Sequence, residues 1–179
     1  MSKISLVLLT LVYGGLLSGS AVFAQKPAAG SMAPIPPALR AEKVFVSNAG
    51  ADSGLFPAPF SGDPDRPYAG FYATLKARGE CTLVPDPSDA DLVLELRLTA
   101  PYGPSEPNKV KGAADPLPML RLVIYDRKTH YVLWALTESI EYAFLQKTHD
   151  RNFDEAIGRL VDDFARVRHA QPANVVPGL

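Results

Sequence analysis

Residues 91–98 read Asp-Leu-Val-Leu-Glu-Leu-Arg-Leu, and this stretch decides the fold. Leucine occupies every second position, while valine, glutamate and arginine stand between the leucines. Successive side chains of a β-strand point to opposite faces, so this period of two predicts a strand with one face in a core and the other at least partly in water. The alternation therefore predicts a sheet with one apolar side.

Two later stretches repeat this division. Leu120–Asp126 and Tyr131–Tyr142 are predicted as the strands of a hairpin, joined by residues 127–130. Each has apolar residues at alternate positions, so both strands are expected to turn one face to the same core, with Trp134 buried in it. The residues expected on the core face are Leu120, Leu122, Ile124, Val132, Trp134, Leu136 and Ile140, and those expected on the opposite face of the second strand are Leu133, Ala135, Thr137 and Ser139.

Two short strands and two helices complete the predicted elements. The strands lie at Lys43–Ser47 and Cys81–Val84. Between them, Pro67 suits the first position of a helix, an apolar stripe follows at helical spacing, and Gly79 ends it. A second helix is predicted from Asn152 as N-cap, with Glu155 three residues on, close to a capping box. The stripes are Tyr68, Phe71, Tyr72 and Leu75, and then Phe153, Ile157, Leu160, Val161, Phe164 and Val167.

The predicted fold is an α+β two-layer sandwich, in which a mostly antiparallel five-stranded sheet carries two helices on one face. Its element order is strand, helix, strand, strand, strand, strand, helix. The chain has 179 residues, is 47% hydrophobic and carries a net charge of −1. This composition suits one globular domain, predicted over residues 42–170, and gives no reason to expect a nucleic-acid partner.

The N-terminus predicts export. Residues 1–24 have the layout of a secretory signal peptide: Lys3, then an apolar stretch, then small residues ending at Ala24, where cleavage is expected. The alternative is an uncleaved membrane anchor, since residues 4–24 carry no charge. Residues 25–41, rich in proline and alanine, are predicted to form a flexible linker and residues 171–179 a disordered tail. The mature protein is therefore expected to be periplasmic or secreted.

Several short stretches together resemble a broad group of exported bacterial α+β domains. The chain is similar there to the amino-terminal domain of TolB-type and penicillin-binding-protein-activator-type envelope accessory proteins, although it has no lipidation cysteine near residue 24 and no propeller after the domain. The resemblance implies an exported accessory or binding domain, and none of its motifs is catalytic. The stretches are Val44-Phe45-Val46, the helix end at 75–79, Leu83-Val84, residues 90–94, residues 122–126, Lys128-Thr129 and Leu133-Trp134.

Two surfaces are candidate binding sites. If both helices cover the leucine face, the opposite sheet face displays Glu95, Arg97, Arg121, Tyr125 and Thr137. In an antiparallel meander the connections that follow the third and fifth strands leave the sheet at the same edge. That edge would bring together five potentially cationic side chains, here called the basic edge: Lys109, Lys111, Lys147, His149 and Arg151. The acidic residues Glu106, Asp115 and Asp150 would partly offset their charge.

Evidence for catalysis in the sequence is thin. His130, His149 and His169 have no metal-binding spacing, and no nucleophile-elbow or phosphate-loop motif occurs. No catalytic residue, metal or cofactor is therefore predicted. Acidic residues in the stretches 52–54 and 63–65, and Asp126, are expected to form turns. Cys81, the one cysteine, is expected to be buried and inert.

These observations favour an exported, non-catalytic accessory or binding domain of the bacterial envelope or secretome, with an unknown protein or glycan partner. A membrane is a partner only if the signal segment stays uncleaved. The alternative is a small hydrolase or ligand-binding enzyme whose site lies in the 48–66 loop and recruits His149. A homodimer is a third possibility, in which Val93, Val123, Tyr125 and Leu133 of two sheets meet.

Overall fold

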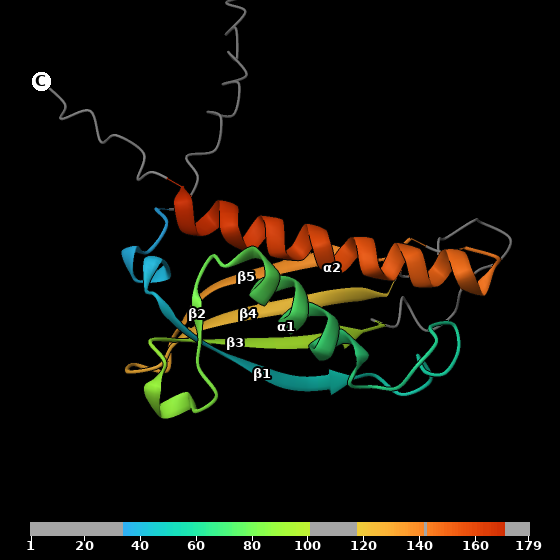
Figure 1. The fold of residues 1–179 in the computed structure, drawn as a ribbon, viewed down its shortest axis with the longest axis horizontal. Coiled ribbons are helices and arrows are strands. Elements are labelled where there is room, and N and C mark those ends of the chain that lie inside the picture. Colours follow the sequence, from blue (N-terminus) through green and yellow to red (C-terminus); the bar gives the residue numbers. More distant parts are fainter. Residues whose placement is uncertain (1–33, 101–117, 142, 171–179) are drawn as a thin grey trace, which may run out of the picture. The chain divides into compact units, whose positions relative to one another are not determined.

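The computed structural model describes residues 34–100, 118–141 and 143–170. Its sheet and helices follow the predicted order of strands and helices (Figure 1). Two short 3₁₀ helices add to that order, at Pro37–Arg40 and Pro87–Asp89. The strands are β1 (Lys43–Ala51), β2 (Thr82–Leu83), β3 (Leu92–Thr99), β4 (Met119–Asp126) and β5 (Val132–Ser139), and the helices are α1 (Arg66–Arg78) and α2 (Gln146–His169).

The five strands form one mixed sheet in the order β2-β1-β3-β4-β5. β3, β4 and β5 make the expected antiparallel meander. β1, however, pairs in parallel with both β2 and β3, so the expectation of a mostly antiparallel sheet is corrected to a mixed one. The reason is the connection through α1, which returns the chain to the sheet in its original direction, as parallel pairing requires.

The alternating leucines behave as the sequence predicts. Leu92, Leu94, Leu96 and Leu98 of β3 are fully or almost fully buried. α1 packs against β1 and β3, and α2 against β4 and β5, so the two helices cover the leucine face (Figure 1). The core between the two layers includes Val44 and Val46 of β1, Phe71 and Leu75 of α1, Leu120, Leu122 and Ile124 of β4, and Phe153, Leu160 and Phe164 of α2.

The predicted face assignment fails at the start of β5. The register shifts between Ile124, which pairs with Trp134, and Tyr125, which pairs with Val132. This bulge breaks the period of two. Val132, expected in the core, is 56% exposed, whereas Leu133, expected on the opposite face, packs against the core beside Trp134. Trp134 itself is only half-buried, because β5 is an edge strand.

The second helix begins earlier than predicted. α2 starts at Gln146, and Asn152 lies inside it, where its side-chain amide donates to the carbonyl of Glu141 at 3.0 Å. Asn152 is therefore not the N-cap. Neither helix of the described ranges is long and apolar enough to span a membrane.

The globular domain also begins earlier than the predicted linker boundary at Ala41. Residues 37–40 form a 3₁₀ helix, and Leu39 is completely buried in the core. Leu39 is held there because the segment packs against the C-terminal part of α2. The predicted signal peptide, residues 25–33 of the predicted linker and the predicted tail lie outside the described residues.

Candidate functional site

The face of the sheet opposite the helices, here called the open face, carries the predicted sheet-face residues. The register places Val93 beside Tyr125, Arg97 beside Arg121, and Arg121 beside Thr137. α1 and α2 both pack on the other face, so neither of them covers these side chains. The open face comprises Phe45, Val93, Glu95, Arg97, Arg121, Val123, Tyr125, Ala135 and Thr137.

One end of the open face is positively charged. Arg97 and Arg121 are exposed and directly opposite each other, an arrangement in which like charges repel. Asp52, just after β1, relieves this repulsion at Arg97: its carboxylate lies 2.9 Å from the guanidinium and also accepts the backbone N–H of Ala100 at 3.0 Å. The hydrogen bond from Arg97, followed by that from Ala100, lowers the pKa of Asp52. Among the described residues, no carboxylate pairs with Arg121.

The middle and far end of the open face are less polar. The hydroxyl of Tyr125 lies 3.5 Å from the carboxylate of Glu95, to which it donates. Glu95 stands opposite Val123, which is only 5% exposed although it belongs to this face. Phe45 and Val93 are neighbours across β1 and β3, and both are half-buried. The open face therefore divides into a charged end and an apolar end.

The structure brings together only part of the predicted basic edge. Lys109 and Lys111 lie outside the described residues. Lys147 is exposed, and the guanidinium of Arg151 lies 3.7 Å from the carboxylate of Glu155 one turn along α2.

His149 does not lie on the surface, because α2 already begins at Gln146 and turns this residue toward the core. His149 is 6% exposed. Its ring meets Phe60 edge-on, with the ring centroids 5.9 Å apart, and its Nε2 accepts the backbone N–H of Ala143 at 3.3 Å. The prediction that His149 belongs to the basic edge is therefore wrong.

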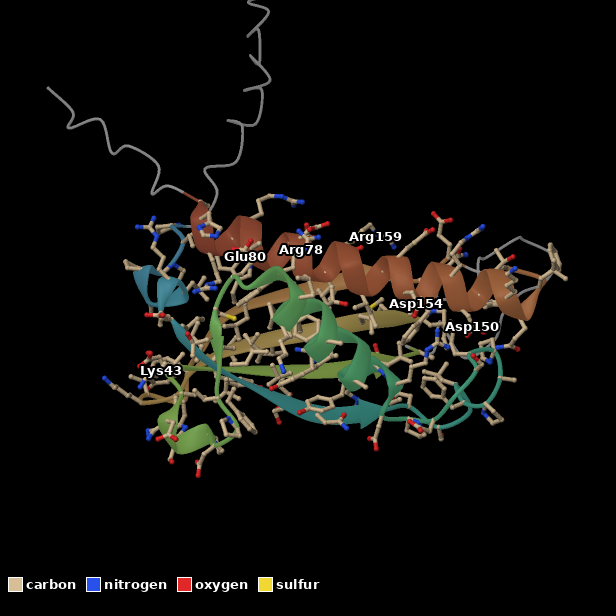
Figure 2. The ribbon with its side chains drawn as sticks, viewed as in Figure 1. Lys43, Arg78, Glu80, Asp150, Asp154 and Arg159 are labelled. Atoms are coloured by element: carbon tan, nitrogen blue, oxygen red, sulfur yellow. The ribbon has the colours of Figure 1, made fainter. Side chains whose placement is uncertain are left out.

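A polar cluster that the sequence analysis missed joins the 52–65 loop to α2. Arg66 donates to the carboxylate of Asp150, to that of Asp154 at 2.9 Å, and to the carbonyl of Ser61 at 2.8 Å. Ser61 donates to Asp150 through its backbone N–H at 3.0 Å and its hydroxyl at 2.8 Å. Figure 2 labels the two carboxylates at one end of α2. We call Ser61, Arg66, Asp150 and Asp154 the loop clamp.

Charged and polar groups of the loop clamp stabilise the ionised form of Asp150. Burial alone would raise the pKa of Asp150, but the hydrogen bonds from Arg66 and Ser61 outweigh it and lower this pKa to about 2. The guanidinium of Arg66 also lies 4.6 Å from the ring centroid of Phe153. Because the donors of Ser61 and Arg66 point at carboxylates and a carbonyl of the protein itself, the clamp fastens the loop to the helix.

His149 lies beside the 48–66 loop, in which the alternative enzyme site is expected. His149 touches the loop through Phe60, and the hydroxyl of Ser61 donates to Asp150. His130 lies in the β4–β5 turn with a φ of 61°, and Nε2 of His169 lies 2.8 Å from the carboxylate of Glu80. No group of three metal-ligating side chains occurs in the described ranges.

Two predictions about individual side chains can be checked directly. Asp126 forms the β4–β5 turn as expected. Its carboxylate accepts two hydrogen bonds from Thr129, one from the backbone N–H at 2.7 Å and one from the hydroxyl at 3.0 Å. Those bonds lower its pKa. Cys81 is half-buried against the core rather than fully buried as expected, and burial raises the pKa of its thiol.

No protein-family model matches the sequence, and no curated protein matches it either. Solved structures to which the chain shows some similarity include the PelC dodecamer from Paraburkholderia phytofirmans, at 15% identity and a TM-score of 0.42, covering 78% of this chain and 95% of that one. TolB from Acinetobacter baumannii matches at 13% identity and a TM-score of 0.42, covering 79% of this chain and 30% of that one. The C-terminal domain of LpoB from Salmonella enterica matches at 13% identity and a TM-score of 0.36, covering 57% and 84%.

Proposed function

We propose that this chain is an exported, non-catalytic accessory domain that binds a protein or glycan partner through the open face of its sheet. The observation that carries this proposal is that α1 and α2 both cover the leucine face of the sheet, and neither covers the other face. A sheet face that keeps arginine and half-buried aromatic side chains in this position has the composition of a binding surface, in which Tyr and Arg are enriched.

The charge pattern defines what the partner must offer. Asp52 neutralises Arg97, while Arg121 beside it has no carboxylate partner within the described part of the chain. A carboxylate or other anionic group on the partner would relieve the repulsion between the two guanidinium groups and could be bound bidentately. Phe45, Val93 and Tyr125 at the other end would supply apolar contact. The proposed partner therefore pairs an acidic group with an apolar patch.

The test starts from the native exported protein, crosslinked in its host and analysed by mass spectrometry. We expect crosslinks from residues of β3–β5 to one recurrent partner. In pull-down with that partner, Arg97→Ala combined with Arg121→Ala should abolish recovery while leaving thermal unfolding nearly unchanged, because exposed ion pairs contribute about 0–1 kcal/mol. Arg166→Ala, at an exposed arginine of α2 outside both candidate surfaces, is the matched control and should bind normally.

Retained binding by the double variant would reject the open face as the docking surface. Export is tested separately, by N-terminal sequencing of the secreted or periplasmic protein. Cleavage after Ala24 is expected, and an intact Met1 in a membrane fraction would instead support the uncleaved anchor.

A further inference from the structure

The two edges of the sheet differ sharply. β2, at one edge, is two residues long, and an edge so short offers little to another strand. β5, at the other edge, is eight residues long and contains no proline, lysine or arginine. Its one charge, Glu138, is bound by Arg159 of α2 at 3.0 Å. β5 therefore lacks most of the devices that normally protect an edge strand, its bulge near Val132 excepted.

The register shows which backbone groups of β5 point away from the sheet. The N–H of Ile140 donates to the carbonyl of Pro118 at 2.8 Å, so Ile140 points toward β4. Because backbone groups alternate along an antiparallel strand, Glu138 and Leu136 also point toward β4, while Ser139, Thr137 and Ala135 point outward. Arg159 confirms this, since its guanidinium donates to the outward carbonyl of Ser139 at 3.1 Å. Figure 2 labels Arg159 on α2.

Ala135 and Thr137 are thus left with outward N–H and C=O groups that no described strand pairs. Their side chains are exposed and small, so they do not obstruct a strand laid beside them. On the helix side, Trp134 and Leu136 are only half-buried, and a neighbouring strand would cover them further. The edge offers both the main-chain pairing and the apolar contact that strand addition uses.

A second copy of this chain would have to bring its own helix to the edge. α2 packs against β4 and β5 and runs along β5 (Figure 1). Two copies joined by antiparallel β5 strands would therefore bring both α2 helices to the same face of the joined sheet. A single extended peptide brings no helix and needs only the backbone groups of the edge strand, so it is the simpler occupant.

We propose that β5 accepts an extended peptide segment of a partner protein as a sixth strand, paired through Ala135 and Thr137. The segment carries apolar side chains at alternate positions, facing Trp134 and Leu136, with small or polar ones between them. Arg159, bound to Ser139, marks where the pairing ends. Ala135 and Thr137 also belong to the open face, but this proposal uses their outward backbone groups, whereas the open-face proposal rests on side chains such as Arg97 and Arg121.

The test uses short random peptides displayed on phage and selected on the full chain, with counter-selection on Thr137→Pro. This variant removes an outward N–H without breaking the pairing to β4, and edge strands tolerate proline there. We expect enriched peptides with alternating apolar residues. A synthesised peptide should protect the amides of Ala135 and Thr137 from hydrogen exchange, and Thr137→Val, which keeps the N–H, should bind it normally.

Three results would overturn the proposal: no peptide enriched over the counter-selection, protection confined to other amides, or unchanged binding when the peptide is N-methylated at alternate residues. The N-methylated peptide keeps the test decisive even if Thr137→Pro fails to fold. Arg97→Ala with Arg121→Ala should leave peptide binding unchanged, so failure of the open-face proposal is distinguished from failure of this one.

Discussion

Asp150 shows how one side chain determines the acid stability of a loop. Its pKa in the folded protein is about 2, below the ordinary value of 3.8. A carboxyl whose pKa is lowered by folding stabilises the protein fully above its unfolded-state pKa, and loses this contribution as the pH falls through its folded pKa. The stabilisation from the loop clamp should therefore be complete near neutral pH and disappear between about pH 4 and pH 2.

Asp150→Asn tests this directly by urea unfolding at a series of pH values. We expect the variant to be less stable than the wild type by about 1–2 kcal/mol at pH 7, and the difference to shrink toward zero near pH 2. Arg151→Gln, at the next position, removes only a surface pair with Glu155 and should cost no more than about 0.5 kcal/mol. A difference between Asp150→Asn and wild type that does not change with pH would contradict the assigned role of the charge.

The contrast between Asp126 and Asp150 explains which sites a sequence can predict. Asp126 binds Thr129, three residues away, so its role in a turn follows from local chemistry. Asp150 binds Ser61 and Arg66, at sequence separations of 89 and 84 residues, and no local pattern indicates such partners. The prediction for His149 was wrong for a related reason. The six residues of α2 before Asn152 have no capping signal in the sequence, so the helix was not expected to include His149 and turn it toward the core.

At the scale of elements, α1 and α2 approach each other closely at Gly70. A methyl group added there would lie 2.8 Å from the Cδ1 atom of Ile157 on α2. Ile157 is 3% exposed, so its side chain has little room to move. Alanine is favoured over glycine inside a helix by about 1 kcal/mol, and this gain competes with the overlap.

A double-mutant cycle separates the two effects. Gly70→Ala alone should be neutral or destabilising, because the overlap cancels the gain in helix propensity. In an Ile157→Val background, which removes the Cδ1 atom, the same substitution should stabilise by about 0.5–1 kcal/mol in urea unfolding. Equal effects in both backgrounds would show that contact with Ile157 does not govern the packing of α1 on α2.

Elements were predictable wherever a face is wholly buried. The leucines of β3 predict the strand to within one residue at each end, its buried side and the face that both helices cover, because a register slip would move the whole apolar set into water. The parallel pairing of β1 was missed, since the short apolar run at Lys43–Ser47 has the same pattern in either direction. The bulge before Trp134 was missed because an edge strand tolerates an extra residue that a central strand would not.

At the scale of the whole domain, Arg168 joins its first and last described segments. Arg168 is 6% exposed, and its guanidinium donates to the carbonyls of Leu39 at 3.2 Å, Ala41 at 2.8 Å and Glu80 at 2.6 Å. Arg40 adds a bond to the carbonyl of Ala170 at 2.9 Å. The segment before β1, the corner after α1 and the end of α2 therefore meet at one side chain.

Two opposing effects decide what happens when Arg168 is removed. Arg168→Met deletes a buried charge, which can be neutral or favourable, but it also leaves three carbonyls without their donor. The guanidinium lies 5.4 Å from the Phe164 ring centroid and makes all three bonds at once, so we expect the second effect to dominate, with a loss of about 2 kcal/mol in urea unfolding. Trypsin should also cleave faster after Arg40, because the 37–40 helix is released. Arg166→Met, at an arginine whose side chain is 74% exposed, is the control and should change neither the free energy of unfolding nor the rate of cleavage. If Arg168→Met is instead more stable than the wild type and equally resistant to trypsin, burying the charge costs more than the three hydrogen bonds contribute.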